Sequence, residues 1–323
     1  MENCLLYDWL SVTLSEDGEW FNEYGESIAD GHIFIELLGM TGVSWEIGSG
    51  THGYSKRLWF EGVNIHLPSE EQHNVWLEMS GSGCRAFETY GHGDWQKVFD
   101  FALRWCNITR LDVSFDDKSG ILDMEKLVGD TYFRREYVTK CNKHHVRMDM
   151  DDRTPDDNGI TIYHGSRQSN LMVRIYDKAQ QLKRYDEHWV RVEMELHREN
   201  ARRFLELEGT IGEKWAGVLL NYVRYVDPDP VDSNRWRWPL KDYWSNLVKA
   251  AQPMKLYQAP GVVYNMERLE GYLFNQAGNS LRTYIECFGV DALIERLKET
   301  QPAVTPAKYK HLIQEWKRGE GSK

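Results

Sequence analysis

The chain has 323 residues, enough for one large domain or two smaller ones with a substantial hydrophobic core. It contains no run of 18 apolar residues, no basic leader with a cleavage site and no C-x-x-C pair among its five scattered cysteines, so we expect a cytoplasmic protein with free thiols rather than an exported or membrane-spanning one. Its net charge of −11 argues at first against a nucleic-acid partner. The acidity is confined to residues 1–103, however, which hold 17 acidic and 4 basic residues. The near-neutral remainder of the chain can still present a local basic groove.

The first third of the chain is predicted to form strands followed by a helix. Residues 6–14, "LYDWLSVTL", alternate and are rich in strand-forming residues, and a glycine-rich stretch follows them. Residues 65–91 indicate a strand, a turn and another strand. Residues 94–105, "DWQKVFDFALRW", place apolar residues at helical spacing, with Asp94 as the N-cap.

The same pattern begins again after residue 105. Residues 107–117, "NITRLDVSFDD", form a predicted strand, and Asp123 caps a predicted short helix. The segments "YDWLSVTL" and "TRLDVSFD" are loosely alike, which is consistent with an internal duplication of a β-rich unit.

The middle of the chain alternates between strands and short connecting segments. Residues 147–159 are acidic and break regular structure, but Arg153 stands where an EF-hand loop needs a ligand oxygen, so we interpret them as a solvated loop. The elements predicted next are strands at 159–166, 170–177 and 189–197, a short helix or turn at 179–188, and a helix from residue 198.

The last part of the chain is predicted to be mostly helical. Residues 227–239 are the best linker candidate, and apolar residues from Met266 to Ile285 recur at helical spacing. The fold class is therefore α+β, with an antiparallel sheet and flanking helices. We divide the chain into a β-rich domain at 1–208 and a mainly helical region at 209–323.

The predicted strands of the middle region each have one apolar face and one polar face, as in an antiparallel sheet with one side on the core. The polar face gathers acids, cations and tyrosines, which are Asp112, Asp116, Glu193, Glu195, Arg174, Lys178, Tyr163 and Tyr176. This polar face has two interpretations. In the first, it is a solvated face whose charges pair across strands, and each pair contributes about 0.2–1 kcal/mol to stability. In the second, the carboxylates bind a hard divalent cation.

A tyrosine on such a face can serve DNA cleavage. Its hydroxyl titrates near 10 in water, but a neighbouring Lys or Arg favours the phenolate and a metal ion polarises a phosphodiester. Attack on a backbone phosphate then releases a 3′-hydroxyl and leaves a 5′-phosphotyrosine. The alternative for Tyr176 is an ordinary strand tyrosine.

Four segments, in chain order, resemble the replication initiation factor family: "YDWLSVT", "TRLDVSFDD", "TIYHGSRQSNLMVRIYDK" and "VRVEMELHRENAR". That family includes rolling-circle initiators of staphylococcal-type plasmids, relaxases of conjugative elements and replication proteins of filamentous phages. The resemblance covers roughly residues 5–205, and "RIYDK" with the following R-x-E-x-E strand is its most specific part. It implies a strongly curved antiparallel sheet and an origin-nicking enzyme that uses a tyrosine and a carboxylate-held divalent metal.

The resemblance also implies roles for individual residues around the tyrosine. Tyr176, within "RIYDK", is implied as the nucleophile. Lys178 and Arg174 are implied as its activators and as phosphate contacts. Tyr163 is the rival nucleophile, because it lies on the same face one strand earlier.

The implied metal is Mg²⁺ or Mn²⁺, held by oxygen ligands. Asp112, Glu193 and Glu195 are the implied ligands, with Asp116 as a weaker candidate. The chain has no His-hydrophobic-His triplet, so a histidine-ligated metal is not expected, and it has no Walker A motif, so ATP-driven unwinding is not expected either.

The sequence thus predicts a metal-dependent, site-specific enzyme that nicks DNA and later rejoins the strand. Its expected partners are origin DNA, single-stranded or hairpin at the nick and duplex nearby, a host helicase and a second copy of the chain. Two alternatives remain. One is a non-catalytic origin-binding regulator on the same fold. The other is a carboxylate-pair glycosidase, which would have no use for Arg174, Tyr176 and Lys178 together.

Overall fold

The structure is a computed structural model that describes residues 2–14, 31–148, 159–254, 270, 273–274 and 278–300. Most of the acidic loop predicted at 147–159, and much of the helical spacing predicted from Met266, lie outside these residues. In the described part, every helix is too short or too polar to cross a bilayer.

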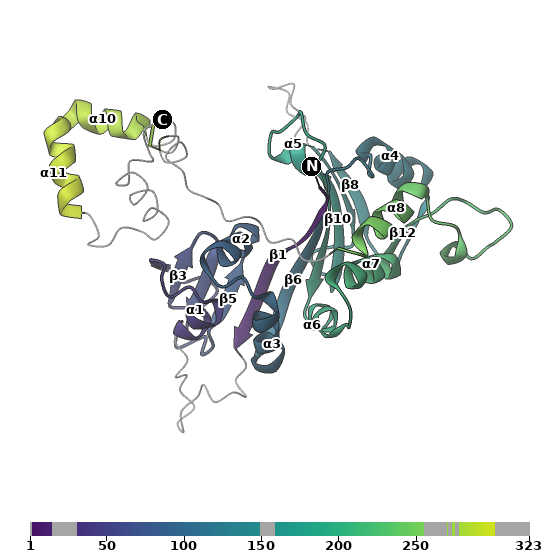
Figure 1. Ribbon diagram of the computed structural model, residues 1–323, viewed down its shortest axis with the longest axis horizontal. Coiled ribbons are helices and arrows are strands. Elements are labelled where there is room, and N and C mark those ends of the chain that lie inside the picture. The colour runs from purple at the N-terminus through teal and green to yellow at the C-terminus, as the bar shows by residue number, and fades with distance from the viewer. Residues whose placement is uncertain are drawn as a thin grey trace.

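Ten antiparallel strands form one sheet in the order β2-β3-β4-β5-β1-β6-β11-β10-β9-β8 (Figure 1). The strands are β1 (Cys4–Leu14), β2 (Glu46–Ser49), β3 (Lys56–Phe60), β4 (Val63–Leu67), β5 (Trp76–Met79), β6 (Cys106–Asp117), β8 (His144–Met148), β9 (Ile160–His164), β10 (Leu171–Asp177) and β11 (Val190–His197). A separate two-stranded sheet pairs β7 (Tyr137–Thr139) with β12 (Val223–Tyr225). The α+β class with an antiparallel sheet is confirmed.

The helices are α1 (His32–Leu38), α2 (Gly81–Tyr90), α3 (Trp95–Trp105), α4 (Met124–Val128), α5 (Lys178–Gln181), α6 (Glu199–Glu206), α7 (Ile211–Tyr222), α8 (Asp242–Ala251), α10 (Gly278–Phe288) and α11 (Val290–Thr300), with a π-helical turn at Gly129–Arg134 and a 3₁₀ turn at Arg235–Arg237. The predicted N-caps are confirmed, because the Asp94 and Asp123 carboxylates accept the backbone N–H groups of Lys97 and Lys126.

The sheet consists of two halves whose five strands are arranged in the same order. The first half runs from β1 through α1 and β2–β5 to α2, and the second runs from β6 through α4 and β8–β11 to α6. Because β1 pairs with β6 at the centre, each half places its remaining strands outward on its own side. This arrangement agrees with the duplicated β-rich unit that the sequence indicated.

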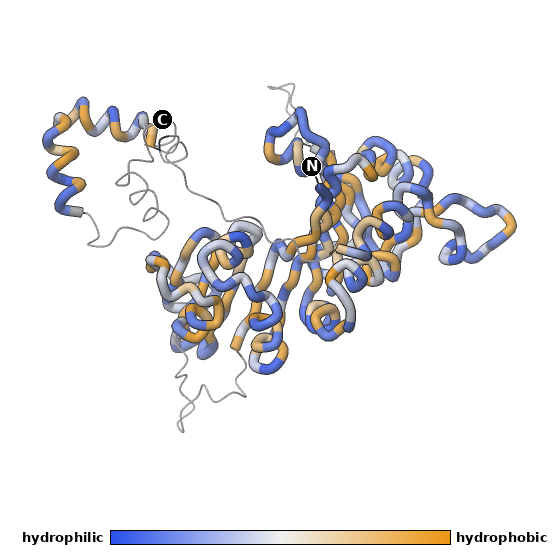
Figure 2. The backbone as a smooth tube through the Cα atoms, viewed as in Figure 1, coloured by the Kyte–Doolittle hydropathy of each residue, from blue (hydrophilic) through white to orange (hydrophobic). Residues whose placement is uncertain are grey.

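One face of the sheet carries the hydrophobic core. Figure 2 shows hydrophobic and hydrophilic residues interleaved along the strands, as period two requires. On the apolar face, the ring of Trp215 from α7 stacks 5.4 Å from Phe115 of β6, and its N–H donates to the carbonyl of Val113. Helix α8 contributes Trp244 and Leu247 to the same core.

Two segments differ from the sequence-based prediction. Helix α2 was not predicted, because Gly81 and Gly83 have poor helix propensity. The structure explains one of them, since a Cβ on Gly83 would lie 2.2 Å from the carbonyl oxygen of Gly62. The predicted linker 227–239 is a loop whose two ends meet in a bridge between Val226 and Leu240, and α7 and α8 on either side of it share one core. The linker prediction was therefore wrong, because this loop does not separate two hydrophobic cores.

Candidate active site

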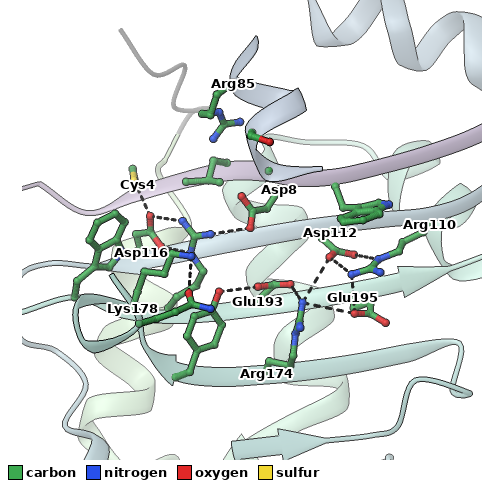
Figure 3. Close-up of a pocket in the computed structure, with 18 of the residues that line it drawn as sticks. Cys4, Asp8, Arg85, Arg110, Asp112, Asp116, Arg174, Lys178, Glu193 and Glu195 are labelled. Carbon is green, nitrogen blue, oxygen red and sulfur yellow. Dashed lines mark hydrogen bonds and ion pairs between the residues drawn. The ribbon is translucent and has the colours of Figure 1, made fainter. Parts of the chain in front are cut away.

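A cavity of about 800 Å³ lies on the polar face of the sheet, where the two halves meet. Strands β1, β6, β10 and β11 supply most of its lining, and the start of α5 and of α2 close its rim (Figure 3). Each of these strands turns alternate residues toward the cavity, so the polar face that the sequence predicted becomes its floor.

Three carboxylates gather at one end of the cavity. Asp112 of β6 lies opposite Glu195 in the strand register, and Glu193 is two residues before Glu195 on β11. One oxygen from each of the three lies within 4.8 Å of the others, and the residues are 1–4% exposed. The structure thus brings together the three residues that were implied as metal ligands.

Two arginines lie among these carboxylates. The guanidinium of Arg110 donates to both oxygens of Asp112, at 2.9 and 2.6 Å, and to Glu195 at 2.9 Å. The guanidinium of Arg174 donates to Glu193 and lies 3.6 Å from Glu195 and 3.8 Å from Asp112. Two cations therefore offset part of the repulsion among three buried anions.

The compensation is uneven. Burial, together with the charges of Glu193 and Glu195, raises the pKa of Asp112 well above its usual range despite the hydrogen bonds from Arg110. Burial also opposes ionisation of Glu195, but its hydrogen bond from His197 and the charge of Arg110 outweigh that cost and lower its pKa. Three buried carboxylates this close together are a donor set that a hard divalent cation fits.

Tyr176 lies beside this group. It is on β10, opposite Arg191 on β11, and its hydroxyl donates to the Oε2 atom of Glu193 at 3.0 Å. Burial, followed by the negative charge of Glu193, raises the pKa of Tyr176 far above that of a free phenol. The Tyr176 hydroxyl therefore keeps its proton in this structure, and it donates that proton in a hydrogen bond to Glu193.

The two implied activators occupy different surroundings. Arg174 forms ion pairs with the carboxylates of Glu193 and Glu195 rather than a hydrogen bond with the hydroxyl of Tyr176. Lys178, the first residue of α5, donates to Gln181 at 2.7 Å, and its Nζ atom lies 5.7 Å from the centre of the Tyr176 ring. Burial and the nearby charge of Arg191 lower the pKa of Lys178. Both cations line the same cavity as the tyrosine.

A second ion-pair group lies next to the first, and its pairing was not predicted from the sequence. The guanidinium of Arg191 donates to both oxygens of Asp116, at 2.6 and 2.9 Å, and to Asp8 at 2.7 Å. The Cys4 thiol also contacts Asp116, at 3.7 Å. Asp116, the weaker metal candidate, is thus held by an arginine and lies outside the group of three carboxylates.

Asp8 reaches the cavity because β1 is irregular at this point. The register between β1 and β6 shifts between Tyr7 and Trp9, so Asp8 is an extra residue in a β-bulge. As a result, Tyr7 points into the core while Asp8 and Trp9 both line the cavity. Regular alternation could not predict the position of Asp8, although it does place Arg191 on the acidic face with Glu193 and Glu195.

Tyr163, the rival nucleophile, has a different environment. It lies on β9 opposite Arg174, and its ring stacks on His145 at 4.5 Å. The neighbouring His144 packs against Tyr137, so the two histidines point to different places. Tyr163 does not belong to the described residues that line the cavity.

The chain matches two protein families along its length. Residues 31–104 match the family described as "Rolling Circle replication initiation protein N-terminal domain", and residues 106–296 match the family described as "Replication initiation factor". The border between the matches falls between α3 and β6, where the second half of the sheet begins.

Individual proteins are similar over most of the chain. A protein of Bacillus subtilis (strain 168), named "Putative DNA relaxase NicK", is 24% identical over 255 residues, which is 74% of this chain and 71% of that protein. A solved structure of a rolling circle replication initiator protein from Geobacillus stearothermophilus is 26% identical, with a TM-score of 0.71 over 80% of this chain and 99% of its own.

Proposed function

Because the chain belongs to the replication initiation factor family, we propose that it is a rolling-circle replication initiator or relaxase that nicks one strand of DNA at an origin. The match to a relaxase and the similarity to a solved initiator support this proposal. The observation that carries it is the hydrogen bond from the Tyr176 hydroxyl to Glu193, at the edge of a three-carboxylate group in a cavity lined with cations.

In the proposed reaction, the Oη atom of Tyr176 attacks the phosphorus of one backbone phosphodiester. The bond from phosphorus to the 3′-oxygen breaks, so the 3′-oxygen leaves and takes up a proton, and a 5′-phosphotyrosine remains. Glu193 is the group in hydrogen-bond contact that can accept the proton of Tyr176. The free 3′-hydroxyl later reverses the step and rejoins the strand.

Asp112, Glu193 and Glu195 would hold a divalent cation, Mg²⁺ or Mn²⁺. When bound, such an ion supplies positive charge that polarises the phosphodiester and offsets the charge of the carboxylates. Arg174 and Lys178 face the same cavity and would contact the phosphates on either side of the scissile bond.

Origin DNA is the partner that follows from this chemistry. The nick requires an accessible strand, which a hairpin or single-stranded segment provides, and nearby duplex would be read by other parts of the chain. We assign this second task, or assembly with a further copy, to the mainly helical region at 209–323. A host helicase and a homodimer stay predictions.

The test is a covalent-adduct assay. The protein is incubated with a labelled single-stranded origin oligonucleotide and Mn²⁺ and run on a denaturing gel. We expect a shifted band that maps to Tyr176, and Tyr176→Phe should abolish the band while retaining oligonucleotide binding.

Tyr163→Phe is the matched control, because it removes the same hydroxyl from the neighbouring strand. It should leave the adduct intact. If Tyr163→Phe abolishes the band and Tyr176→Phe does not, the enzyme stands but the site is wrong. Tight origin binding without any adduct would favour the non-catalytic regulator.

A further inference from the structure

Positions in the two halves of the sheet can be matched through their strand register. Glu78 of β5 lies opposite Ser11 of β1, in the same way that Glu193 of β11 lies opposite Ser114 of β6. Counting outward from these pairs gives the other correspondences, which are Trp9 for Asp112, Asn64 for Arg174, His66 for Tyr176 and Trp76 for Arg191. The first half therefore contains a counterpart of the catalytic site.

This counterpart lacks the residues that the chemistry around Tyr176 needs. A tryptophan stands in place of the Asp112 ligand, and Ser80 follows β5 where Glu195 stands on β11. Of the three carboxylates, one has a counterpart, Glu78, and burial raises its pKa. One carboxylate is too few for a hard divalent cation, and a histidine in place of Tyr176 rules out the same covalent attachment.

Aromatic rings occupy positions in the first half that match charged residues of the second half. The Trp76 and His66 rings stack at 4.0 Å with 14° between their planes, and Tyr54 lies 5.6 Å from each of them. Trp76 is half-buried, and its N–H donates to Ser11 at 2.8 Å. Flat, partly exposed rings on a strand face are the surfaces on which unpaired bases stack.

Buried polar atoms in this cluster lack partners. His66 is 2% exposed, and neither of its ring nitrogens has a hydrogen-bond partner among the residues that the structure describes. The same holds for the Oδ1 atom of Asn64. Burial lowers the pKa of His66 to about 4, so the ring is neutral and offers one donor and one acceptor. Unpaired buried groups of this kind cost free energy unless a ligand satisfies them.

The cluster adjoins the cavity through Trp9. Trp9, which lines the cavity, supports the guanidinium of Arg110 at 4.4 Å from its ring centre, and Arg110 in turn holds Asp112. The same strand, β1, pairs with β5, which carries Trp76. A DNA strand that lies across the cavity floor therefore meets the cluster next to the catalytic residues.

We propose that the face formed by Trp9, Asn64, His66, Trp76 and Glu78 binds an unpaired nucleobase of the strand that is cleaved at Tyr176. This inference rests on the proposed function. A base suits the face better than a phosphate does, because residues 1–103 carry 17 acidic and only 4 basic residues. Stacking on Trp76 and hydrogen bonds to Asn64 and His66 then hold the base, while the catalytic half holds the phosphate.

Photocrosslinking of the unaltered chain tests this directly. A single-stranded origin oligonucleotide carries one 5-iodo-2′-deoxyuridine, placed at each position in turn around the nick, and cross-linked peptides are identified by mass spectrometry. We expect at least one position to cross-link to Trp76, Tyr54 or Trp9. Cross-links confined to the region after residue 103, or none at any position, would overturn the inference.

Affinity measurements provide the second test. Trp76→Ala should weaken binding of the oligonucleotide at least about fivefold, because base stacking on an aromatic ring is worth about 1–3 kcal/mol. Trp45→Ala is the matched control, since Trp45 packs against the core in the same half of the chain. Circular dichroism checks that both variants are folded.

The two proposals fail in different ways. If the unaltered chain forms no covalent adduct with the oligonucleotide on any tyrosine, the proposed function fails. If the adduct forms but Trp76→Ala binds as tightly as Trp45→Ala does, the base-binding face alone is wrong.

Discussion

The hydroxyl of Tyr176 donates a hydrogen bond to the carboxylate of Glu193, and this contact opposes ionisation of the hydroxyl. Negative charge beside a phenol stabilises the proton, so burial and Glu193 together raise the pKa of Tyr176. The cations that could favour the phenolate are engaged elsewhere, Arg174 by Glu193 and Lys178 by Gln181. In the proposed mechanism, ionisation of Tyr176 therefore requires additional positive charge beside the carboxylates.

Metal binding should therefore stabilise the chain as well as activate it. Saturating Mn²⁺ should raise the free energy of unfolding by about 2–3 kcal/mol when its concentration is 100 times the dissociation constant, and EDTA should reverse this and abolish the adduct. Thermal unfolding of the protein without DNA measures the effect independently of activity.

Glu195→Gln removes one proposed ligand and should lose most of the metal-dependent stabilisation. Glu206→Gln is its control, because Glu206 is exposed and pairs with Arg202 on α6. Equal stabilisation of both variants by Mn²⁺ would contradict the assigned ligands. An adduct that still forms in EDTA would contradict the proposed metal dependence of the attack by Tyr176.

A buried histidine elsewhere makes stability depend on pH. His164 of β9 is fully buried, and its Nε2 atom lies 3.0 Å from the Tyr225 hydroxyl. Burial, aided by the charge of His144, lowers the pKa of His164 to about 3, against about 6.5 in an unfolded chain. Between these two values the unfolded state binds the extra proton, so stability decreases as the pH falls below about 6.5.

Lowering the pH from 6.5 to 5 should cost about 2 kcal/mol through His164 alone, since one proton contributes about 1.4 kcal/mol per pH unit. Urea unfolding at several pH values measures the slope. His164→Asn should flatten it, while His73→Asn, at an exposed position, should leave it unchanged. An identical slope in all three proteins would show that another group controls acid stability.

At the scale of elements, two irregularities position the site. The bulge in β1 turns Asp8 toward Arg191, and the loop at 165–170 joins β9 to the strand that carries Tyr176. Gly165 begins this loop at φ +110°, where a Cβ atom would lie 2.8 Å from the Leu171 carbonyl oxygen. Both backbone strain and a steric clash therefore require glycine at this position.

Gly165→Ala should lower the free energy of unfolding by about 2 kcal/mol or more. Gly120→Ala separates the two causes, because Gly120 has a similar φ of +83° but no described atom within 4 Å of the place that a Cβ would occupy. The control should cost about 1 kcal/mol, through backbone strain alone. Chemical denaturation gives both values, and equal costs would mean that the clash relaxes without penalty.

At the scale of the molecule, the core extends past the predicted boundary at residue 208. Helices α7 and α8 pack on the sheet, and the last buried residue of α8 is Ala251. Helices α10 and α11 lie further along the chain and expose apolar side chains such as Phe288 and Leu297. The proposed recognition or assembly role thus falls most naturally on the chain beyond Met254.

A chain that ends at Met254 should fold and still form the covalent adduct on a single-stranded oligonucleotide. It should lose most of its preference for duplex origin over unrelated duplex, because phosphate contacts alone carry no sequence information. Competition binding at fixed salt measures this preference. Unchanged preference in the shortened chain would place origin recognition within the sheet domain.

The sequence alone determined the two faces of the sheet and the residues on them. Strand alternation is a local property, so Asp112, Glu193, Glu195, Arg174 and Tyr176 could be assigned to one face from their spacing. The N-caps of α3 and α4 were equally local. The sequence predicted which residues make up the site, a set of acids, cations and a tyrosine, but not how they are arranged.

Only the tertiary structure decided which of these groups meet. Pairing of β11 with β6 sets Glu195 opposite Asp112, and pairing with β10 sets Glu193 opposite Arg174. The bulge at Asp8, the glycines of α2 and the counterpart site around His66 depend on contacts between segments far apart in the chain. Such contacts are set by strand register and packing, and no periodicity within one strand contains them.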